Sequence, residues 1–576
     1  MFVRVKKSGK YQYLQIVHNQ RSGGQVRQRV LGTLGRLDVL KASGQLDGLL
    51  ASCARFAQHS AVLSAERENR LEPLRRVRIG PPLIFERLWQ QLGLPKLLRR
   101  LLADRKFGFD VERAVFLTVL HRLFAPGSDR AAERWKSGYA IAGVEGLQLH
   151  HLYRAMAWLG EPLPEDQQAD ATPFAPRCVK DWIEEALFQK TRDLFSGLDL
   201  VFFDTTSIYF EGAGGDSIGQ YGNSKDHRRD RKQMVVAVVL DNEGRPICCE
   251  LWPGNTSDAK TLIPIIDRLR CRFHIQSICV VADRGMISRE TIRSLGQPER
   301  NVRFILGARL RAVNEVSQVV LRRGGRYREV FGPKQKSKDP APLKVKEVWV
   351  EDRRYIVCLN EEQAEADRAN REAIVAALQD QLKQGATSLV GNKGYRKYLS
   401  TRPGGGFEID REKVERDAHF DGKWVLQTDT DLSAVECALK YKELWMVEQL
   451  FRSLKSILKT RPIYHQCDET IRGHAFCSFL ALVLLKELYA RLEGRGWQPE
   501  WKQLRDDLDA LEEITLQTDG KTFILRTETE GHAAQAIQAT GVALPPRIRL
   551  AHDDQPPPPS TQQPRSAKVQ TRRRNP

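Results

Sequence analysis

Five short apolar segments between residues 199 and 308 constrain the fold of this chain more than any other feature. In order, they read VFFDTTSIYF, MVVAVVLD, PICCELW, SICVVADRG and RFILGA. Runs of this length bounded by turn residues are typical of buried strands. Two helical segments, SDAKTLIPIIDRLR and SRETIRSL, separate the third segment from the fourth and the fourth from the fifth. Three successive strands followed by alternating helices and strands predict a mixed α/β sheet with helices on its faces.

Two aspartates follow the buried segments of this sheet. Asp204 comes directly after LVFF, and Asp283 comes after ICVVA. A carboxylate at the end of a buried strand is costly unless it is paired, binds a metal ion or opens onto solvent. Taken singly, each is more simply explained as a cap for the following loop. If the two strands are neighbours, however, the carboxylates converge, and a third carboxylate from a helix would complete an all-oxygen site for Mg²⁺ or Mn²⁺.

Residues 441–455, YKELWMVEQLFRSLK, contain the candidate third carboxylate. Tyr441, Glu448 and Lys455 are spaced seven residues apart. A seven-residue step turns an α-helix almost twice, so one helix, expected from about 433 to 458, would carry all three on one face. A merely solvated helix face is the competing interpretation. With Glu448 as the third ligand, two divalent ions can activate water and neutralise a leaving oxygen at a phosphodiester.

The charge of the chain agrees with a nucleic-acid substrate. Its 576 residues carry a formal net charge of +19, and such an excess attracts polyanions. Anionic membrane surface and a ribosome-associated role are the alternatives. The ten cysteines are scattered without a C-x-x-C pair, which fits neither a disulfide framework nor a zinc cluster and favours a reducing cytoplasm. The most apolar run, FCSFLALVLL, is too short to span a bilayer and predicts a buried helix.

Several blocks of the sequence resemble the DDE transposases of bacterial insertion sequences, in the branch whose catalytic domain is interrupted by a strand-rich insertion before the glutamate. These blocks are YGNSKDHRRDRKQMVVAVVLD, PGNTSD and RPIYHQCDETIRGHAFCSFLAL, and the resemblance covers roughly residues 200–490. The glutamate helix of that family reads tyrosine, two residues, arginine, three residues, glutamate, six residues, lysine. The present sequence matches at Tyr441, Glu448 and Lys455 and departs at the arginine position, which is Leu444.

The resemblance implies an RNase H-like fold with Asp204, Asp283 and Glu448 as catalytic residues and ligands of two Mg²⁺ ions, with Mn²⁺ as an alternative. It implies an enzyme that binds the terminal repeats of an insertion sequence, cleaves the DNA ends by two-metal hydrolysis and joins the freed 3′-hydroxyls to target DNA. A homodimer would hold two ends of double-stranded DNA together. The alternatives are a catalytically inactive DNA-binding protein and an RNase H-like nuclease without strand transfer.

The resemblance also implies contacts to DNA around the glutamate. Tyr441 and Lys455 would bind phosphates or bases of the element end. Arg452, one turn beyond the glutamate, would supply the phosphate contact that Leu444 lacks. Lysine serves as a point charge for phosphate without bidentate geometry.

The flanking segments complete the predicted architecture. Residues 2–31 alternate as strands around Gly-containing turns, which predicts a basic β-ribbon whose cations contact DNA. An exposed basic hairpin without a ligand is the alternative. The cations expected to do so are Lys6, Lys7, Arg27 and Arg29. The expected divisions are the ribbon (1–36), a helical DNA-end-binding domain (37–197), the catalytic core (198–309 and 426–495), a β-rich insertion (310–425), a C-terminal region (496–550) and a disordered basic tail (551–576).

Four further residues have simpler explanations than catalysis. Asp429 and Asp431 precede the glutamate helix and are interpreted as its caps. His465 and His474 have no cysteine or acidic partner in a metal pattern, which favours structural or DNA-contacting roles. Neither G-x-x-x-x-G-K-[ST] nor G-x-G-x-x-G is present, so we expect no nucleotide cofactor. The predicted location is the cytoplasm, associated with the nucleoid when bound to DNA.

Overall fold

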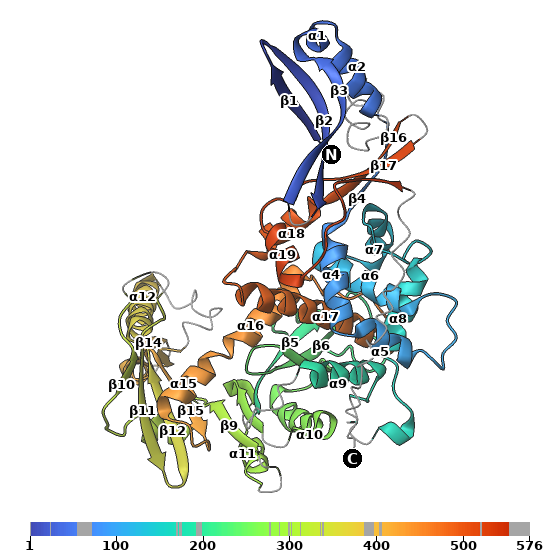
Figure 1. Cartoon of the computed structure of the whole chain (residues 1–576). Helices are drawn as coiled ribbons and strands as arrows, with labels where there is room; N and C mark the ends of the chain where they lie inside the picture. Colours follow the sequence, from blue (N-terminus) through green and yellow to red (C-terminus); the bar gives the residue numbers. More distant parts are fainter. Residues whose placement is uncertain are drawn as a thin grey trace, which may run out of the picture. The chain divides into compact units, whose positions relative to one another are not determined.

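The computed structural model divides the chain into two compact units, which are coloured by sequence in Figure 1. The first comprises Met1–Leu83, Gly138–Ala140 and Pro499–Pro576, and the second comprises Ile84–Ser137 and Ile141–Gln498. The structure describes residues 2–22, 25–54, 72–168, 171, 175–191, 199–275, 278–286, 288–297, 300, 302–311, 313–334, 336, 339–384, 397–401, 406–518 and 521–551. The predicted disordered tail, apart from its first residue, lies outside these ranges.

A nine-stranded sheet lies at the centre of the second unit, in the order β10-β11-β12-β15-β9-β8-β5-β6-β7. Its strands are β5 (Asp199–Tyr209), β6 (Gln233–Leu240), β7 (Pro246–Pro253), β8 (Ile278–Ala282), β9 (Val302–Gly307), β10 (Arg328–Phe331), β11 (Leu343–Val350), β12 (Arg353–Leu359) and β15 (Lys423–Thr428). Strands β5, β6 and β7 form an antiparallel meander, whereas β8 runs parallel to β5 and β9 parallel to β8. The five strands β7-β6-β5-β8-β9 follow the order 3-2-1-4-5 of an RNase H-like fold, as predicted.

Helices cover both faces of these five strands. One face packs against α9 (Val179–Thr191), α10 (Leu262–Phe273) and α11 (Arg289–Leu295) in a single hydrophobic cluster. Val201 and Phe203 of β5 belong to this cluster. Successive strand residues point to opposite faces, so Phe202 and Asp204 face the other side. That side contacts the helices α15 (Ala434–Lys442), α16 (Trp445–Arg452) and α17 (Asp468–Glu493).

Helix α17 carries the FCSFLALVLL segment and is buried along most of its length. It packs against α6 (Val111–Phe124) and α8 (Leu149–Leu159). All fourteen residues of α6 are buried. The sequence predicted a buried helix for the FCSFLALVLL segment of α17, and the structure confirms it. Within the described ranges, none of the helices combines the length and hydropathy needed to cross a membrane.

Strands β10, β11 and β12 of the insertion extend the central sheet, whereas β13 (Leu399–Thr401) and β14 (Phe407–Ile409) form a separate two-stranded sheet. Strand β12 pairs with β15, and β15 pairs with β9 of the core. The long polar helix expected at residues 361–384 is α12 (Glu361–Gln384). It packs with the short strands β13 and β14 around a small cluster that includes Leu378.

The described part of the first unit contains two sheets. The three strands β1 (Phe2–Ser8), β2 (Tyr11–Ser22) and β3 (Gln25–Arg36) form an antiparallel ribbon. The helices α1 (Leu37–Ala42) and α2 (Gln45–Ala54) follow. The second sheet has the order β18-β17-β16-β4. Its strands are β4 (Glu72–Arg78), β16 (Glu512–Thr518), β17 (Lys521–Arg526) and β18 (Ile548–Leu550).

The prediction of one helical domain over residues 37–197 is therefore wrong at its N-terminal part. Strand β4 interrupts the helices, and the chain up to Leu83 groups with the C-terminal region. The physical reason is a long-range pairing, because β4 is antiparallel to β16 and its Arg76 forms a salt bridge with the buried Glu512. Because the paired residues lie more than 400 positions apart in the sequence, no local sequence pattern indicates this strand.

A buried ionic network ties α9 and α10 to the sheet. Arg272 lies at its centre and is fully buried. Its guanidinium donates to Glu184 at 2.7 Å and to Glu250 at 3.0 Å. Lys180 pairs with Asp181 at 2.6 Å in the same cluster. Buried charges of this kind are tolerated because each one has a partner.

We predict that Arg272→Met destabilises the protein by about 3–5 kcal/mol, because it leaves buried carboxylates without their cation. Urea unfolding followed by circular dichroism measures the change. The matched control is Arg293→Ala on the exposed surface of α11, with an expected change within about 0.5 kcal/mol. Equal stabilities of the Arg272 variant and the wild type would contradict the assigned role of the network.

Candidate active site

One cleft of about 450 Å³ brings together the three predicted carboxylates, Asp204, Asp283 and Glu448. Asp204 and Asp283 approach each other because β5 and β8 are parallel neighbours, with Phe203 opposite Ala282. Each aspartate follows one of these paired residues. Glu448 is exposed on α16, which contacts β5 and β6. Among the described residues, these three carboxylates do not meet within 4.8 Å of one another.

Asp204 does not end its strand, contrary to the expectation from the sequence. Strand β5 continues to Tyr209, still paired with β6, after β8 has ended beside it. Asp204 is therefore the first residue of β5 that is no longer paired with β8. Its side chain faces the cleft. Burial raises the pKa of Asp204 to about 6, although Lys225 and a hydrogen bond from the Thr205 amide oppose the shift.

Asp283 receives a hydrogen bond from the glutamate segment. The Tyr441 hydroxyl donates to Asp283 Oδ1 at 2.9 Å. Burial, and next the Asp283 charge, raise the pKa of Tyr441 far above its ordinary value, so the phenol stays protonated and remains a donor. The side chain for which the sequence predicted a DNA contact is bound to a carboxylate of the same cleft in this structure.

The helix expected from 433 to 458 is broken into three pieces. α15 ends at Lys442, α16 begins at Trp445, and a π-helical turn occupies Ser453–Ile457. Because of this break, the seven-residue spacing does not describe one continuous helix face. Tyr441 and Glu448 line the cleft together, whereas Lys455 forms a salt bridge with Asp226 at 2.8 Å.

The caps of this segment differ from the sequence interpretation. Ser433 is the N-cap of α15 and forms a capping box with Glu436. Asp429 instead accepts a hydrogen bond from the Phe304 amide at 2.7 Å. Asp431 is almost fully exposed and lies 3.6 Å from Arg303. The capping box supplies the N-cap through Ser433 and Glu436, so neither aspartate is the cap of this helix.

Lys225 and Asp258 join the site without having been predicted. The Lys225 ammonium donates to the carbonyl and hydroxyl oxygens of Thr205 at 2.7 and 2.8 Å and lies 3.2 Å from Asp258. Asp258 also accepts from the Thr205 hydroxyl at 2.7 Å. Lys225 and Asp258 belong to the YGNSKD and PGNTSD segments, which carried the family resemblance. That resemblance could have indicated them, but neither spacing nor periodicity predicted a role for either residue.

Comparison with known proteins decides the family. A family model described as "Transposase DDE domain" matches residues 196–484, half of the chain, and contains all three carboxylates. The chain belongs to the DDE transposase family. A second model, "IS1634 family transposase, N-terminal domain", matches residues 3–66 and includes the β-ribbon. The predicted membership among the transposases of insertion sequences is confirmed.

Other comparisons add little to the description of this transposase. No curated protein matches the chain. Among solved structures, a cryo-EM structure of the piggyBac transposase synaptic complex with hairpin DNA aligns with 74% of this chain and 79% of its own. The TM-score is 0.37 and the sequence identity 9%, a likeness that carries no argument about the site.

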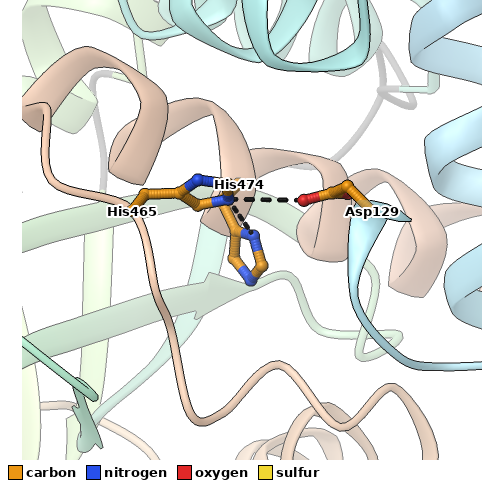
Figure 2. A group of neighbouring side chains, drawn as sticks. All are labelled: Asp129, His465 and His474. Atoms are coloured by element: carbon orange, nitrogen blue, oxygen red, sulfur yellow. Dashed lines mark hydrogen bonds and ion pairs between the residues drawn. The ribbon is translucent and has the colours of Figure 1, made fainter. Parts of the chain in front are cut away.

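A second polar cluster of the transposase joins Asp129, His465 and His474 (Figure 2). His465 Nε2 lies 3.4 Å from Asp129 Oδ2 and 3.0 Å from His474 Nδ1, and His474 Nε2 lies 3.2 Å from the Thr460 carbonyl. Asp129 is thus the acidic partner that the sequence did not show. Arg122 lies 3.0 Å from His474 Nδ1, where its fixed charge opposes a bound cation, so the cluster fits a hydrogen-bonded network better than a metal site.

Three of the predicted DNA-contacting cations of the ribbon are exposed, namely Lys6, Lys7 and Arg29. Lys6 and Lys7 lie on β1, and Arg29 lies on β3. The side chain of Arg27 lies outside the described part of the chain. Arg452 is exposed at the end of α16.

We predict that Asp204→Asn stabilises the metal-free protein above pH 6. A raised carboxyl pKa means that Asp204 contributes most stability below its ordinary pKa of about 3.9 and that this contribution is lost as the pH rises through about 6. The variant should exceed the wild type by about 3 kcal/mol at pH 8, and the gap should shrink toward pH 4.5. Urea unfolding in chelator measures it, and a variant less stable at pH 8 would contradict the assignment.

Proposed function

We propose that this protein is the transposase of an insertion sequence, which binds the terminal repeats of the element, cleaves the DNA ends and joins the freed 3′-hydroxyls to target DNA. The placement of Asp204 and Asp283 carries the proposal. Asp204 lies on β5, Asp283 directly follows the parallel strand β8, and both share a cleft with Glu448, inside the segment that matches the DDE domain.

The donor set of the cleft fits divalent cations. DDE transposase domains use such ions, and three carboxylates offer the oxygen ligands that Mg²⁺ and Mn²⁺ prefer. The pKa of Asp204 is raised by burial, because the surrounding protein groups neutralise the charge of this buried carboxylate only in part. The proposed ligands of the two ions are Asp204, Asp283 and Glu448. When bound, the ions would favour deprotonation of the attacking water and neutralise the leaving oxygen.

The protein groups around the ligands prepare them for this task. Lys225 favours the ionised form of Asp204, which is the form that binds a cation. Its ammonium is fixed by Thr205 and Asp258, so this influence is part of the folded site. Glu448 stands exposed at the edge of the cleft, accessible to both ions and DNA.

Double-stranded DNA is the proposed partner. The +19 charge, the exposed cations of the ribbon and Arg452 suit a phosphate backbone. Lys455 is proposed to contact DNA by exchanging Asp226 for a phosphate. Two element ends must be held together for transposition, which favours a homodimer acting on nucleoid DNA in the cytoplasm.

We predict that the purified protein nicks a duplex carrying its own terminal repeat and joins the 3′ end to target DNA with Mg²⁺ but not with chelator. Asp204→Asn, Asp283→Asn and Glu448→Gln should each reduce both steps by at least about 10³-fold, because several kcal/mol of transition-state stabilisation are lost. Labelled-strand gel assays measure this. Glu443→Gln, paired with Lys440 on the same segment, is the matched control and should retain activity.

The same assays separate the alternatives. Cleavage that survives one of the three substitutions removes that residue from the ligand set. Binding of the repeat without any cleavage favours an inactive DNA-binding protein. Cleavage without joining favours an RNase H-like nuclease.

We predict that the triple variant Lys6→Ala, Lys7→Ala, Arg29→Ala binds the terminal-repeat duplex more weakly and with a lower salt dependence. Each phosphate contact that is lost should reduce the slope of log K against log salt by about 1. Fluorescence anisotropy between 50 and 300 mM salt measures the slope. Unchanged affinity and slope would exclude the ribbon from DNA binding.

A further inference from the structure

We propose that Tyr441 is a positioning residue, whose hydroxyl holds the Asp283 carboxylate in the orientation that binds a divalent cation, and that Gly307 provides the space for this contact. This inference rests on the proposed function of the cleft. It assigns Tyr441 a role different from the DNA contact implied by the family resemblance.

The first observation is the hydrogen bond itself. Tyr441 Oη lies 2.9 Å from Asp283 Oδ1. The donor comes from the last turns of α15, and the acceptor comes from the residue after β8. Asp283 lies between the end of β8 and the 3-10 helix Arg284–Met286. These backbone elements do not select one side-chain rotamer, and a hydrogen bond from another element limits the rotation of the carboxylate. Oδ2 then remains available as a ligand.

The second observation is independent and concerns Gly307 at the end of β9. A Cβ built on this residue would lie 2.3 Å from Tyr441 Oη and 3.0 Å from its Cζ. Gly307 lies in a paired strand, opposite Leu426 of β15, and is absent from the residues with positive φ. Its backbone conformation therefore does not require glycine. Glycine is required here because a side chain would occupy the space through which the phenol ring of Tyr441 reaches Asp283.

Together these contacts join three elements at one ligand. β8 supplies Asp283, β9 supplies the open surface at Gly307, and α15 supplies the donor. Helix α15 ends at Lys442, and the next helix, α16, carries Glu448 to the same cleft. The orientation of the second carboxylate is thus coupled to the segment that carries the third. Hydrogen-bond partners of metal ligands typically change metal affinity 10- to 100-fold when removed.

The decisive experiment compares Tyr441→Phe with wild type in two measurements on the full chain. The first is a titration of Mn²⁺ into the protein bound to a terminal-repeat duplex, followed by the electron paramagnetic resonance signal of free Mn²⁺. The second is duplex affinity by anisotropy in chelator. We expect Mn²⁺ affinity to fall by about 10- to 100-fold while duplex affinity changes less than about twofold. Tyr327→Phe, a tyrosine packed in the insertion, is the matched control and should leave both unchanged.

Gly307→Ala tests the same contact from the opposite side. It should weaken Mn²⁺ binding to a similar degree, and combining it with Tyr441→Phe should add little, because both act through one hydrogen bond. Thermal unfolding of each variant verifies that it is folded, and Tyr441→Phe keeps the test valid if Gly307→Ala does not fold.

Three results would overturn the proposal. Unchanged Mn²⁺ affinity in Tyr441→Phe would remove the positioning role. A loss of duplex affinity with unchanged Mn²⁺ affinity would instead assign Tyr441 to DNA. If the wild type neither binds Mn²⁺ through Asp204 and Asp283 nor cleaves, the proposed function itself fails. If the wild type binds Mn²⁺ and cleaves, and Tyr441→Phe behaves in the same way, only the positioning role fails.

Discussion

The parallel pairing of β5 with β8 is the constraint on which the rest of the catalytic unit depends. It places Phe203 opposite Ala282 and so sets two aspartates next to each other at the edge of a buried sheet. Burial removes hydration from such carboxylates, and two neighbouring carboxylates also repel each other. The raised pKa of Asp204 expresses this cost. A fold keeps such a pair only where surrounding groups, or a bound cation, offset it.

The offsetting groups come from every side of the cleft. Lys225, fixed by Thr205 and Asp258, lies beside Asp204. Tyr441 donates to Asp283. On the opposite face of the sheet, the network around Arg272 holds α9 and α10 in place without access to the cleft. The sheet therefore separates paired charges, which stabilise the fold, from incompletely neutralised charges, which remain available for chemistry.

Local sequence was sufficient for the elements that are defined by short-range patterns. The five buried strands, the long helix α12 and the buried helix α17 all occur where periodicity placed them. Patterns that depend on partners far along the chain were not predicted. Strand β4 exists through its pairing with β16, the glutamate helix is interrupted after Lys442, and Asp129, at the start of α7 (Asp129–Trp135), contacts His465 in a loop.

The sequence by itself determined which groups this transposase carries: three carboxylates at fixed positions, a strongly basic chain, and strands whose order predicts a mixed α/β sheet. Only the tertiary structure decided how these groups are engaged. In the folded protein, Tyr441 donates a hydrogen bond to Asp283, and Lys455 forms a salt bridge with Asp226. Lys225 and Asp258 lie beside Thr205, the residue after Asp204. The reason is physical, since residue types and periodicity follow from neighbours along the chain, whereas hydrogen bonds across a cleft depend on which strands and helices pack together.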